Sequence, residues 1–211
     1  MLLGCLAASG LWGQQVLLRV RFAQVDARAE RLLAPSLLET SNHDFRTLRG
    51  DVDLVTLLEN LRARGGGVRL VAEPTLLTAG AKPGKLLVGD TVPIPVLRAG
   101  QVVVQNREIG VQLTMQPTIN AEGIRLSIRP SVSVIYRSPA AQMTIPELGT
   151  RTTDVELDVA PGQSIVIDGL FDDLTKALLR NLPPNKISEA ILKNGTDPNT
   201  KLLVIVTPEV L

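Results

Sequence analysis

Residues 108–135 read EIGVQLTMQPTINAEGIRLSIRPSVSVI, and this stretch decides the fold. Apolar and polar residues alternate in both of its halves. The apolar set is Val111, Leu113, Met115, Ile124, Leu126 and Ile128. A period of two places one set on the buried face of a strand and the other on its wet face. We therefore predict two half-buried strands, joined as a hairpin through residues 120–123.

The same alternation recurs on both sides of this hairpin. Upstream, Val16–Asp26 (VLLRVRFAQVD) predicts a strand, and Val68–Thr78 predicts another, interrupted at Glu73–Pro74. Downstream, we expect strands at Val155–Val159, within Gln163–Phe171, and at Lys201–Thr207, where Pro208 stops the last one.

Most helical signals lie in the first third of the chain, and a further short helix is indicated near Ser188–Lys193. Residues 27–38 fit a short helix broken at Pro35, and residues 40–50 form a polar loop. Asp51 is a good helix N-cap before apolar residues at helical spacing, and the glycines at 65–67 stop that helix and form a flexible link. The fold class is therefore mainly β with one or two short helices. An antiparallel sheet wetted on one side and a barrel wall facing a watery lumen both give this pattern.

Composition excludes several functions. The 22 basic and 21 acidic residues give a net charge of +1, which offers no electrostatic footprint for nucleic acid, and only 2% of residues are aromatic. With one cysteine and one histidine, neither an internal disulfide nor a Cys/His zinc cluster is expected. We expect no cofactor and no metal.

An enzyme remains an alternative, carried by the chain's carboxylates. Asp154, Glu156 and Asp158 share one strand face, although three like charges fit a solvated face better than an acid/base pair. Asp168, Asp172 and Asp173 lie around a strand end without the spacing of a calcium loop. His43, in the polar stretch SNHD, has no nucleophile elbow nearby, so we interpret it as a solvated loop residue.

The first 15 residues are apolar and rich in small side chains. Three interpretations stay open: a signal-peptide remnant, a lipobox that ends in Cys5, or an apolar tail. No later segment reaches the roughly 18 apolar residues of a membrane helix. We expect residues 1–15 to be this remnant or tail, and residues 16–211 to form one β-domain.

Several stretches, in order along the chain, resemble the secretin family, the channels of type II and type III secretion and of type IV pili. They match the secretins of tight-adherence (Flp) pili best. The matching stretches are Val16–Val25, Val71–Leu76 (VAEPTL), Gly80–Val96 with its closing PIPV, Glu108–Ile119, Ile124–Ile135, Ile145–Leu157, Gly162–Asp173 (GQSIVIDGLFDD) and Leu202–Val210 (LLVIVTPEV). Each is weak alone, whereas their shared order is specific.

The resemblance implies a β-domain that forms a multi-subunit, double-walled β-barrel in the bacterial outer membrane. A chain of this length cannot close a wide barrel alone, so the expected partner is a ring of its own copies. Other implied partners are the outer membrane, an exported protein or pilus, and a pilotin lipoprotein.

The resemblance also implies pore residues. Polar strand residues are expected to face the lumen or water: Arg19, Arg21, Gln112, Gln116, Arg125 and Arg129. A loop is expected at 137–149, and Asn106 is turn-like. The candidate gate segments lie between Val96 and Glu108 and between Ile135 and Thr152. The gate candidates are Gly100, Asn106, Pro139, Pro146 and Gly149.

Two departures from the family pattern favour an alternative. Residues 182–195 resemble the corresponding family segment only weakly, and we expect no periplasmic ring domains before the β-domain. The alternative is an orphan secretin-like fragment that does not form a working channel.

Overall fold

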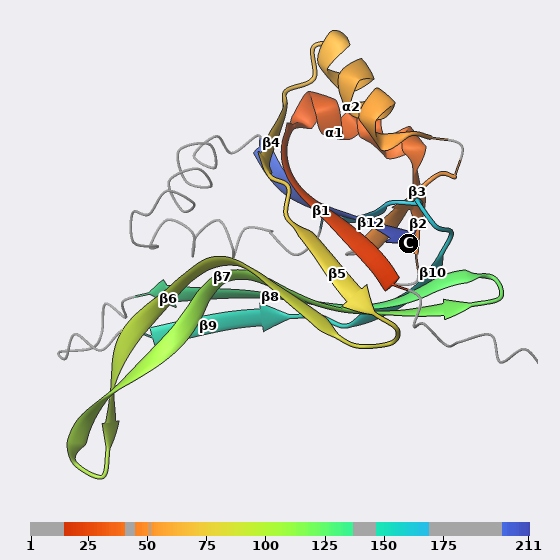
Figure 1. The fold of residues 1–211 in the computed structure, drawn as a ribbon. Helices are drawn as coiled ribbons and strands as arrows, with labels where there is room; N and C mark the ends of the chain where they lie inside the picture. The colour runs from red at the N-terminus through yellow and green to blue at the C-terminus, as the bar shows by residue number, and fades with distance from the viewer. Residues whose placement is uncertain (1–14, 41–44, 51, 137–146, 169–199) are drawn as a thin grey trace, which may run out of the picture.

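Two antiparallel sheets and a pair of helices form three layers in the computed structural model (Figure 1), which describes residues 15–40, 45–50, 52–136, 147–168 and 200–211. Sheet A has the order β2-β3-β11-β12-β1-β4, and β5 also pairs with β1. Its strands are β1 (Gln15–Asp26), β2 (Leu37–Glu39), β3 (Phe45–Leu48), β4 (Val68–Ala72), β5 (Thr75–Ala79), β11 (Ile165–Ile167) and β12 (Thr200–Val210). The predicted mainly β fold is confirmed.

Sheet B is a meander with the order β10-β8-β7-β6, and β9 continues the edge next to β8. Its strands are β6 (Gly84–Arg98), β7 (Gln101–Asn120), β8 (Gly123–Tyr136), β9 (Glu147–Thr152) and β10 (Val155–Val159). The predicted hairpin is confirmed, because β7 and β8 pair from Gly110↔Ser133 to Asn120↔Gly123. Sheet B is thus built from neighbours in sequence.

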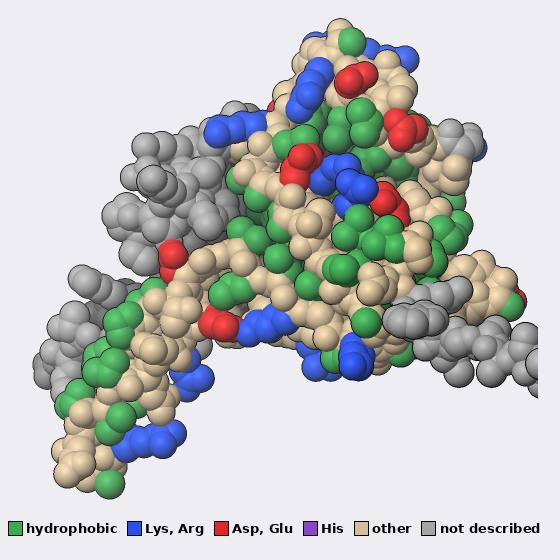
Figure 2. Space-filling view, in the orientation of Figure 1, with side chains coloured by type: hydrophobic (Ala, Val, Ile, Leu, Met, Phe, Trp, Pro, Cys, Tyr) green, Lys and Arg blue, Asp and Glu red, His purple; other side chains and the backbone are tan. Residues whose placement is uncertain are grey.

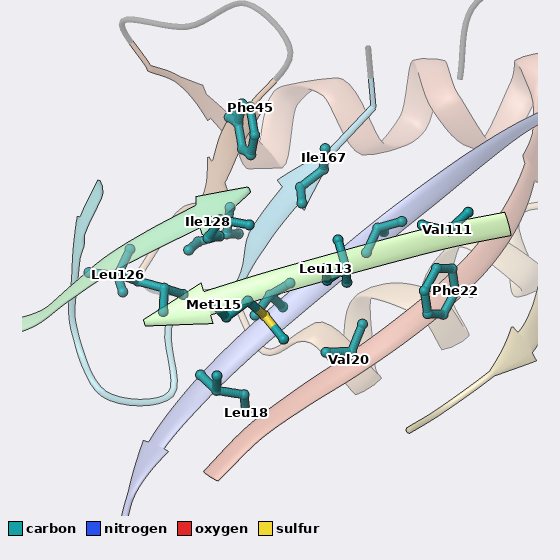
Figure 3. Packing of buried hydrophobic residues seen from close by; sticks show 14 of the residues in the cluster. Leu18, Val20, Phe22, Phe45, Val111, Leu113, Met115, Leu126, Ile128 and Ile167 are labelled. Carbon is teal, nitrogen blue, oxygen red and sulfur yellow. The ribbon is translucent and has the colours of Figure 1, made fainter. Parts of the chain in front are cut away.

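The main core lies between the two sheets (Figure 3). Leu18, Val20 and Phe22 of β1 face Val111, Leu113 and Met115 of β7 across it. Leu113, Met115, Ile124, Leu126 and Ile128 are all fully buried. The alternation in residues 108–135 therefore codes the inner face of sheet B.

The opposite face of sheet A is covered by α1 (Ala27–Leu33) and α2 (Leu54–Ala63), and a short 3-10 helix at Ala34–Ser36 contains Pro35. A second apolar cluster joins Leu54, Leu58 and Leu61 of α2 to Val25 and Leu203 of sheet A. Sheet A is therefore buried on both faces where the helices lie.

Asp26, at the end of β1, links sheet A through hydrogen bonds to α1 and to the glycines that follow α2. Its carboxylate accepts the N–H of Ala29, at 2.6 Å, as the N-cap of α1, and the N–H of Gly67, at 2.8 Å. The glycines do end α2, as predicted, but they are closely packed and not a flexible link. A Cβ on Gly67 would lie 2.8 Å from the Asp26 carboxylate, and Gly65 has a φ of +75°.

We expect Asp26→Ala to lower the free energy of unfolding by about 1 kcal/mol or more, because two backbone donors lose their acceptor. Asp26→Asn keeps one acceptor oxygen and should cost less. The N–H groups of Ala29 and then Gly67 hold the pKa of Asp26 below its ordinary value. The contribution of the Asp26 carboxylate to the free energy of unfolding is therefore complete above its pKa in the unfolded chain, about 3.9. This contribution is lost as pH falls through the lower pKa of Asp26 in the folded chain. Urea titrations at pH 7 and pH 3 measure this, and equal losses for D26A at both pH values would contradict it.

Prolines within the strands lie where only one neighbouring strand is present. Pro117 is opposite Leu126, beyond the point where β6 stops pairing with β7. Pro130 is opposite Leu113, and its other side faces the gap between β10 and β9. Pro208 is opposite Leu18, beyond the end of β11. A missing N–H therefore costs no ladder hydrogen bond, and the prediction that Pro208 stops the last strand is wrong.

Two further predictions near the helices need correction. The N-cap of α2 is Asp53, whose carboxylate accepts the N–H of Thr56 at 2.8 Å; the cap is not Asp51. The expected polar loop at 40–50 contains β3, in which Phe45 and Leu48 are buried. With four residues, β3 is too short to show an apolar period in the sequence.

Candidate functional site

The outer face of sheet B, opposite the main core, is polar. The register brings Gln112, Gln116, Arg125 and Arg129 onto this face, since Thr114 pairs with Arg129 and Thr118 with Arg125. Arg125 donates two hydrogen bonds to Asp158, at 2.9 and 3.1 Å, and Arg129 forms an ion pair with Asp154. Four of the predicted pore residues therefore share one hydrated surface.

We expect Arg125→Gln to raise the pKa of Asp158. The Arg125 hydrogen bonds, more than any other interaction, hold that pKa below its ordinary value. Carboxyl carbon NMR against pH measures it. Arg129→Gln is the matched control, because Arg129 pairs with Asp154 and not with Asp158. An Asp158 pKa that is the same in R125Q and in the parent chain would contradict the arrangement.

Arg19 and Arg21 lie elsewhere. They alternate with Leu18, Val20 and Phe22 of the main core, so they project from the opposite, helix-bearing face of sheet A. Arg19 donates to Glu209 at 2.8 and 3.1 Å, and Arg21 lies 3.3 Å from Glu73. The structure therefore does not bring the six predicted pore residues together. Both sheets and the core separate the two groups.

The first candidate gate is an extended hairpin arm, residues 90–109 of β6 and β7, and its turn is not at Asn106. β6 and β7 pair without interruption from Gly84↔Met115 to Arg98↔Gln101, and Asn106 lies within β7 opposite Pro93. The turn is at Ala99–Gly100, both with positive φ, +48° and +79°. Such a two-residue turn matches the twist of a hairpin, so Gly100 marks the tip of the arm.

The two faces of the arm carry different side chains. Pro93, Pro95, Val102 and Val104 alternate onto one face, and Val102 and Val104 are 70% and 63% exposed. The other face carries Arg98 and Arg107 together with four aliphatic residues, Val92, Ile94, Val96 and Val103. Figure 2 shows hydrophobic side chains along one side of this arm and Lys or Arg side chains along the other. An exposed apolar strip on a two-stranded ribbon is typical of a contact surface.

The arm bends where two glycines face each other, Gly89 of β6 and Gly110 of β7. A Cβ on Gly89 would lie 1.9 Å from the carbonyl oxygen of Ile109, and one on Gly110 would lie 2.4 Å from that of Val88. Gly110 also has a φ of +123°. Lys85 forms an ion pair with Glu108, which the register places six residues further along the hairpin, so the pair spans the bend. The pairing of β7 with β8 also ends at Gly110.

The second candidate gate is only partly described. Pro139 and Pro146 lie outside the described residues. Gly149 lies within β9, opposite Val134 of β8, and so does not belong to a loop. The predicted loop at 137–149 is therefore shorter at its C-terminal end than the sequence indicated.

Sequence reasoning missed the glycine pair at the bend and the two open edges of sheet B. The glycines are 21 positions apart, so their juxtaposition becomes visible only when β6 and β7 are paired with the turn at Ala99–Gly100. The turn itself is hard to recognise in the sequence, because Ala-Gly is a weaker signal for a two-residue hairpin turn than Asn-Gly.

The structure describes four of the six carboxylates that carried the enzyme alternative, whereas Asp172 and Asp173, like His43, lie outside the described residues. Asp168 forms an ion pair with Arg46. Asp154 and Asp158 form ion pairs with arginines, and Glu156 is exposed between them. In the part of the chain that the structure describes, no group of three or more His, Cys, Asp or Glu side chains is placed to hold a metal ion. No helix within the described ranges has the length and apolar character needed to cross a membrane.

Comparison with known proteins identifies the class. Residues 62–184 match the secretin family, described as bacterial type II and III secretion system protein. Because this match covers more than half of the chain, the chain belongs to the secretin family. Assignment to the tight-adherence branch stays a prediction.

Two relatives show how much of a longer protein is matched. The uncharacterised protein y4xJ of Sinorhizobium fredii is 36% identical over 107 residues, which cover 48% of this chain and 25% of that protein. The secretin ExeD of Aeromonas salmonicida is 24% identical over 157 residues, 67% of this chain and 23% of that protein. The matched part thus spans a quarter or less of these relatives.

Among solved structures, the chain is similar to the type II secretin GspD from enteropathogenic Escherichia coli, with a TM-score of 0.47 and 14% identity, covering 94% of this chain and 69% of that one. It is also similar to the type IV competence pilus secretin PilQ of V. cholerae, with a TM-score of 0.46 and 14% identity, covering 94% and 61%.

Proposed function

We propose that the chain is a subunit of a homo-oligomeric outer-membrane secretin channel, which exports proteins or a type IV (Flp/Tad) pilus. Membership of the secretin family supports the class of function. The observation that carries the oligomer is a sheet with two edges, neither of which is paired by a described strand of the same chain.

The open edges belong to sheet B. β6 forms one edge, β9 and β10 form the other, and no described strand pairs with the outer side of either. Exposed edges invite strand addition. Head-to-tail joining of β6 to the β9–β10 edge of the next copy uses two different surfaces, and such a contact closes into a ring when its rotation permits.

Side chains at the two edges complement each other. Leu86 and Val88 of β6 pack only partly against the main core, and so do Val155 and Leu157 of β10. In a ring these half-buried residues cover one another, and the core continues from copy to copy. Burial of such aliphatic side chains is worth about 25 cal/mol per Å² of apolar surface removed from water.

Charge also favours this joint. Lys82 lies just before β6 and Lys85 near its start. Asp154 lies just before β10, which contains Glu156 and Asp158. Opposite charges on the two edges favour head-to-tail contact over contact between like edges. Glu156 forms no ion pair among the described residues, so it is the carboxylate best placed for a partner's lysine.

We assign the lumen to the outer face of sheet B, with Gln112, Gln116, Arg125 and Arg129 facing the water-filled pore. Arg19 and Arg21, on the opposite side, face water elsewhere. The arm with Gly100 at its tip and Asn106 in its β7 strand is the proposed gate, together with the segment that holds Pro139 and Pro146 and ends before Gly149.

The remaining assignments rest on the family and on the sequence patterns described above. Residues 16–211 form the secretin β-domain, and residues 1–15 are a signal-peptide remnant or apolar tail. The proposed partners are other copies of the chain, the outer membrane, an exported protein or pilus, and a pilotin lipoprotein. We propose no enzymatic activity, cofactor or nucleic-acid partner.

Reconstitution of the full chain into planar lipid bilayers tests this function. We expect Glu156→Lys to reduce the yield of conducting channels severalfold, because it sets a cation against Lys82 and Lys85 of the neighbouring copy, and Lys82→Glu in the same chain should restore part of it. Glu122→Lys, in the β7–β8 turn away from both edges, is the control. Folded protein that never conducts would favour the orphan-fragment alternative.

A further inference from the structure

The open edge of β6 carries two prolines in alternate positions, Pro93 and Pro95. Both are exposed, whereas Ile94 between them is 4% exposed and faces the other way. They lie opposite Asn106 and Val104 of β7. Elsewhere in the strands, Pro117, Pro130 and Pro208 lie where a second neighbouring strand is absent. Pro93 and Pro95 thus mark a side of β6 that lacks two successive donors.

The pairing register shows which backbone groups of β6 point outward. A two-residue turn closes on the pair Arg98↔Gln101, which exchanges both hydrogen bonds. Hydrogen-bonded and non-bonded pairs alternate along an antiparallel ladder. Even-numbered residues of β6 therefore bond to β7, and odd-numbered residues point to the open edge. Outward N–H groups are present at Lys85, Leu87, Gly89, Thr91 and Leu97, and absent at Pro93 and Pro95.

A strand added to this edge would find a donor at every outward position up to Thr91 and then none at two consecutive positions. Two of its carbonyls would be left without partners, and the proline rings would occupy the space of its backbone. The ladder would have to resume at Leu97 for a single bond, next to the turn. Pairing beyond Thr91 is therefore unfavourable.

We propose that Pro93 and Pro95 end the hydrogen-bonded seam between neighbouring copies at Thr91. Below this point, β6 seals the wall to the next copy. Beyond Thr91, toward the tip, the arm of residues 90–109 forms no backbone hydrogen bonds with the neighbouring copy. The inference rests on the proposed ring, and it names the surface that the partner copy uses and where that surface stops.

The position of this stop relative to the bend gives it a function. The seam ends two residues after Gly89, which together with Gly110 forms the bend. The pairing of β7 with β8 ends at Gly110 as well. The pairing of β6 with the next copy and the pairing of β7 with β8 thus both end near the glycine pair. Each arm can therefore change its angle without breaking hydrogen bonds of the wall. The prolines separate a sealed wall from an independently moving gate.

Hydrogen exchange of assembled rings, resolved to single amides by fragmentation mass spectrometry, tests the inference. We expect the amides of Leu87, Gly89 and Thr91 to exchange at least about 100-fold more slowly in rings than in the unassembled chain. The amide of Leu97, which also points outward, should exchange equally fast in both. In Pro93→Val/Pro95→Val, the restored donors should extend the seam and slow the exchange of Leu97. Val104→Thr, opposite Pro95, alters the arm without adding a donor and should change nothing.

The outcomes separate the two proposals. Rings in which Leu97 is protected as strongly as Thr91 would overturn the proline stop and leave the channel standing. Rings of the P93V/P95V variant in which Leu97 still exchanges fast would overturn it as well, since the prolines would not be what ends the seam. Absence of rings under all conditions would overturn the channel, and the seam with it.

Discussion

Replacing Gly110 with alanine is expected to yield rings that conduct continuously, where the parent protein is closed most of the time. The methyl group would meet the carbonyl of Val88 at 2.4 Å, and a φ of +123° strains any residue with a side chain. The hairpin relieves the steric clash and the backbone strain by moving its two strands apart at the bend. Since the arm is the proposed gate, its angle changes and the pore opens. Single-channel recording in planar bilayers measures the open probability.

A second route to the same change provides a check. Gly89→Ala brings a methyl group against the carbonyl of Ile109 from the other strand, and it should open the channel in the same way. Gly50→Ala is the matched control, because a Cβ there meets nothing within 4 Å. If G110A and G89A rings assemble and stay closed like those of the parent chain, the bend does not set the gate.

Leu113→Ala is expected to lower the free energy of unfolding of the unassembled chain by about 2–5 kcal/mol. Leu113 is fully buried in the middle of β7, between the two sheets (Figure 3). Its loss leaves a cavity that neighbours held in two sheets cannot close. Since a domain's whole stability is about 5–15 kcal/mol, this loss is a large fraction of it. Urea titration followed by circular dichroism gives the value.

Leu77→Ala is the control for the core prediction. Leu77 lies in β5 and is 53% exposed, so its truncation removes the same atoms with little loss of burial. Similar losses for L113A and L77A would mean that the space between the sheets is not the main core.

The alternation in residues 108–135 was sufficient to predict the hairpin, its turn and its buried face, because a period of two is a direct consequence of strand geometry. Short elements were harder. β3 has four residues, too few for a period, and it becomes a strand because β2 and β11 pair with it from distant parts of the chain. Pro208 was misjudged for a related reason, since a proline is compatible with a strand wherever the adjacent strand has ended.

The polar character of the candidate site was predictable from the sequence, whereas the relative positions of its residues in the fold were not. Gln112, Gln116, Arg125 and Arg129 were recognised as a wet face from their alternation alone, and the register confirms that they share it. Arg19 gave the same signal, yet it lies across the core, because alternation assigns a face of one strand and cannot say which way that face points in the fold. The glycine bend required two facing strands to be known at once.

Electron microscopy of the full chain, extracted from outer membranes in mild detergent, tests the central claim most directly. The account predicts rings with a central plug, and two-dimensional classes of G110A rings should show the plug weakened or lost. Only monomers or small aggregates, from protein whose circular dichroism shows the folded β-sheet signal, would contradict the claim that this chain forms a channel.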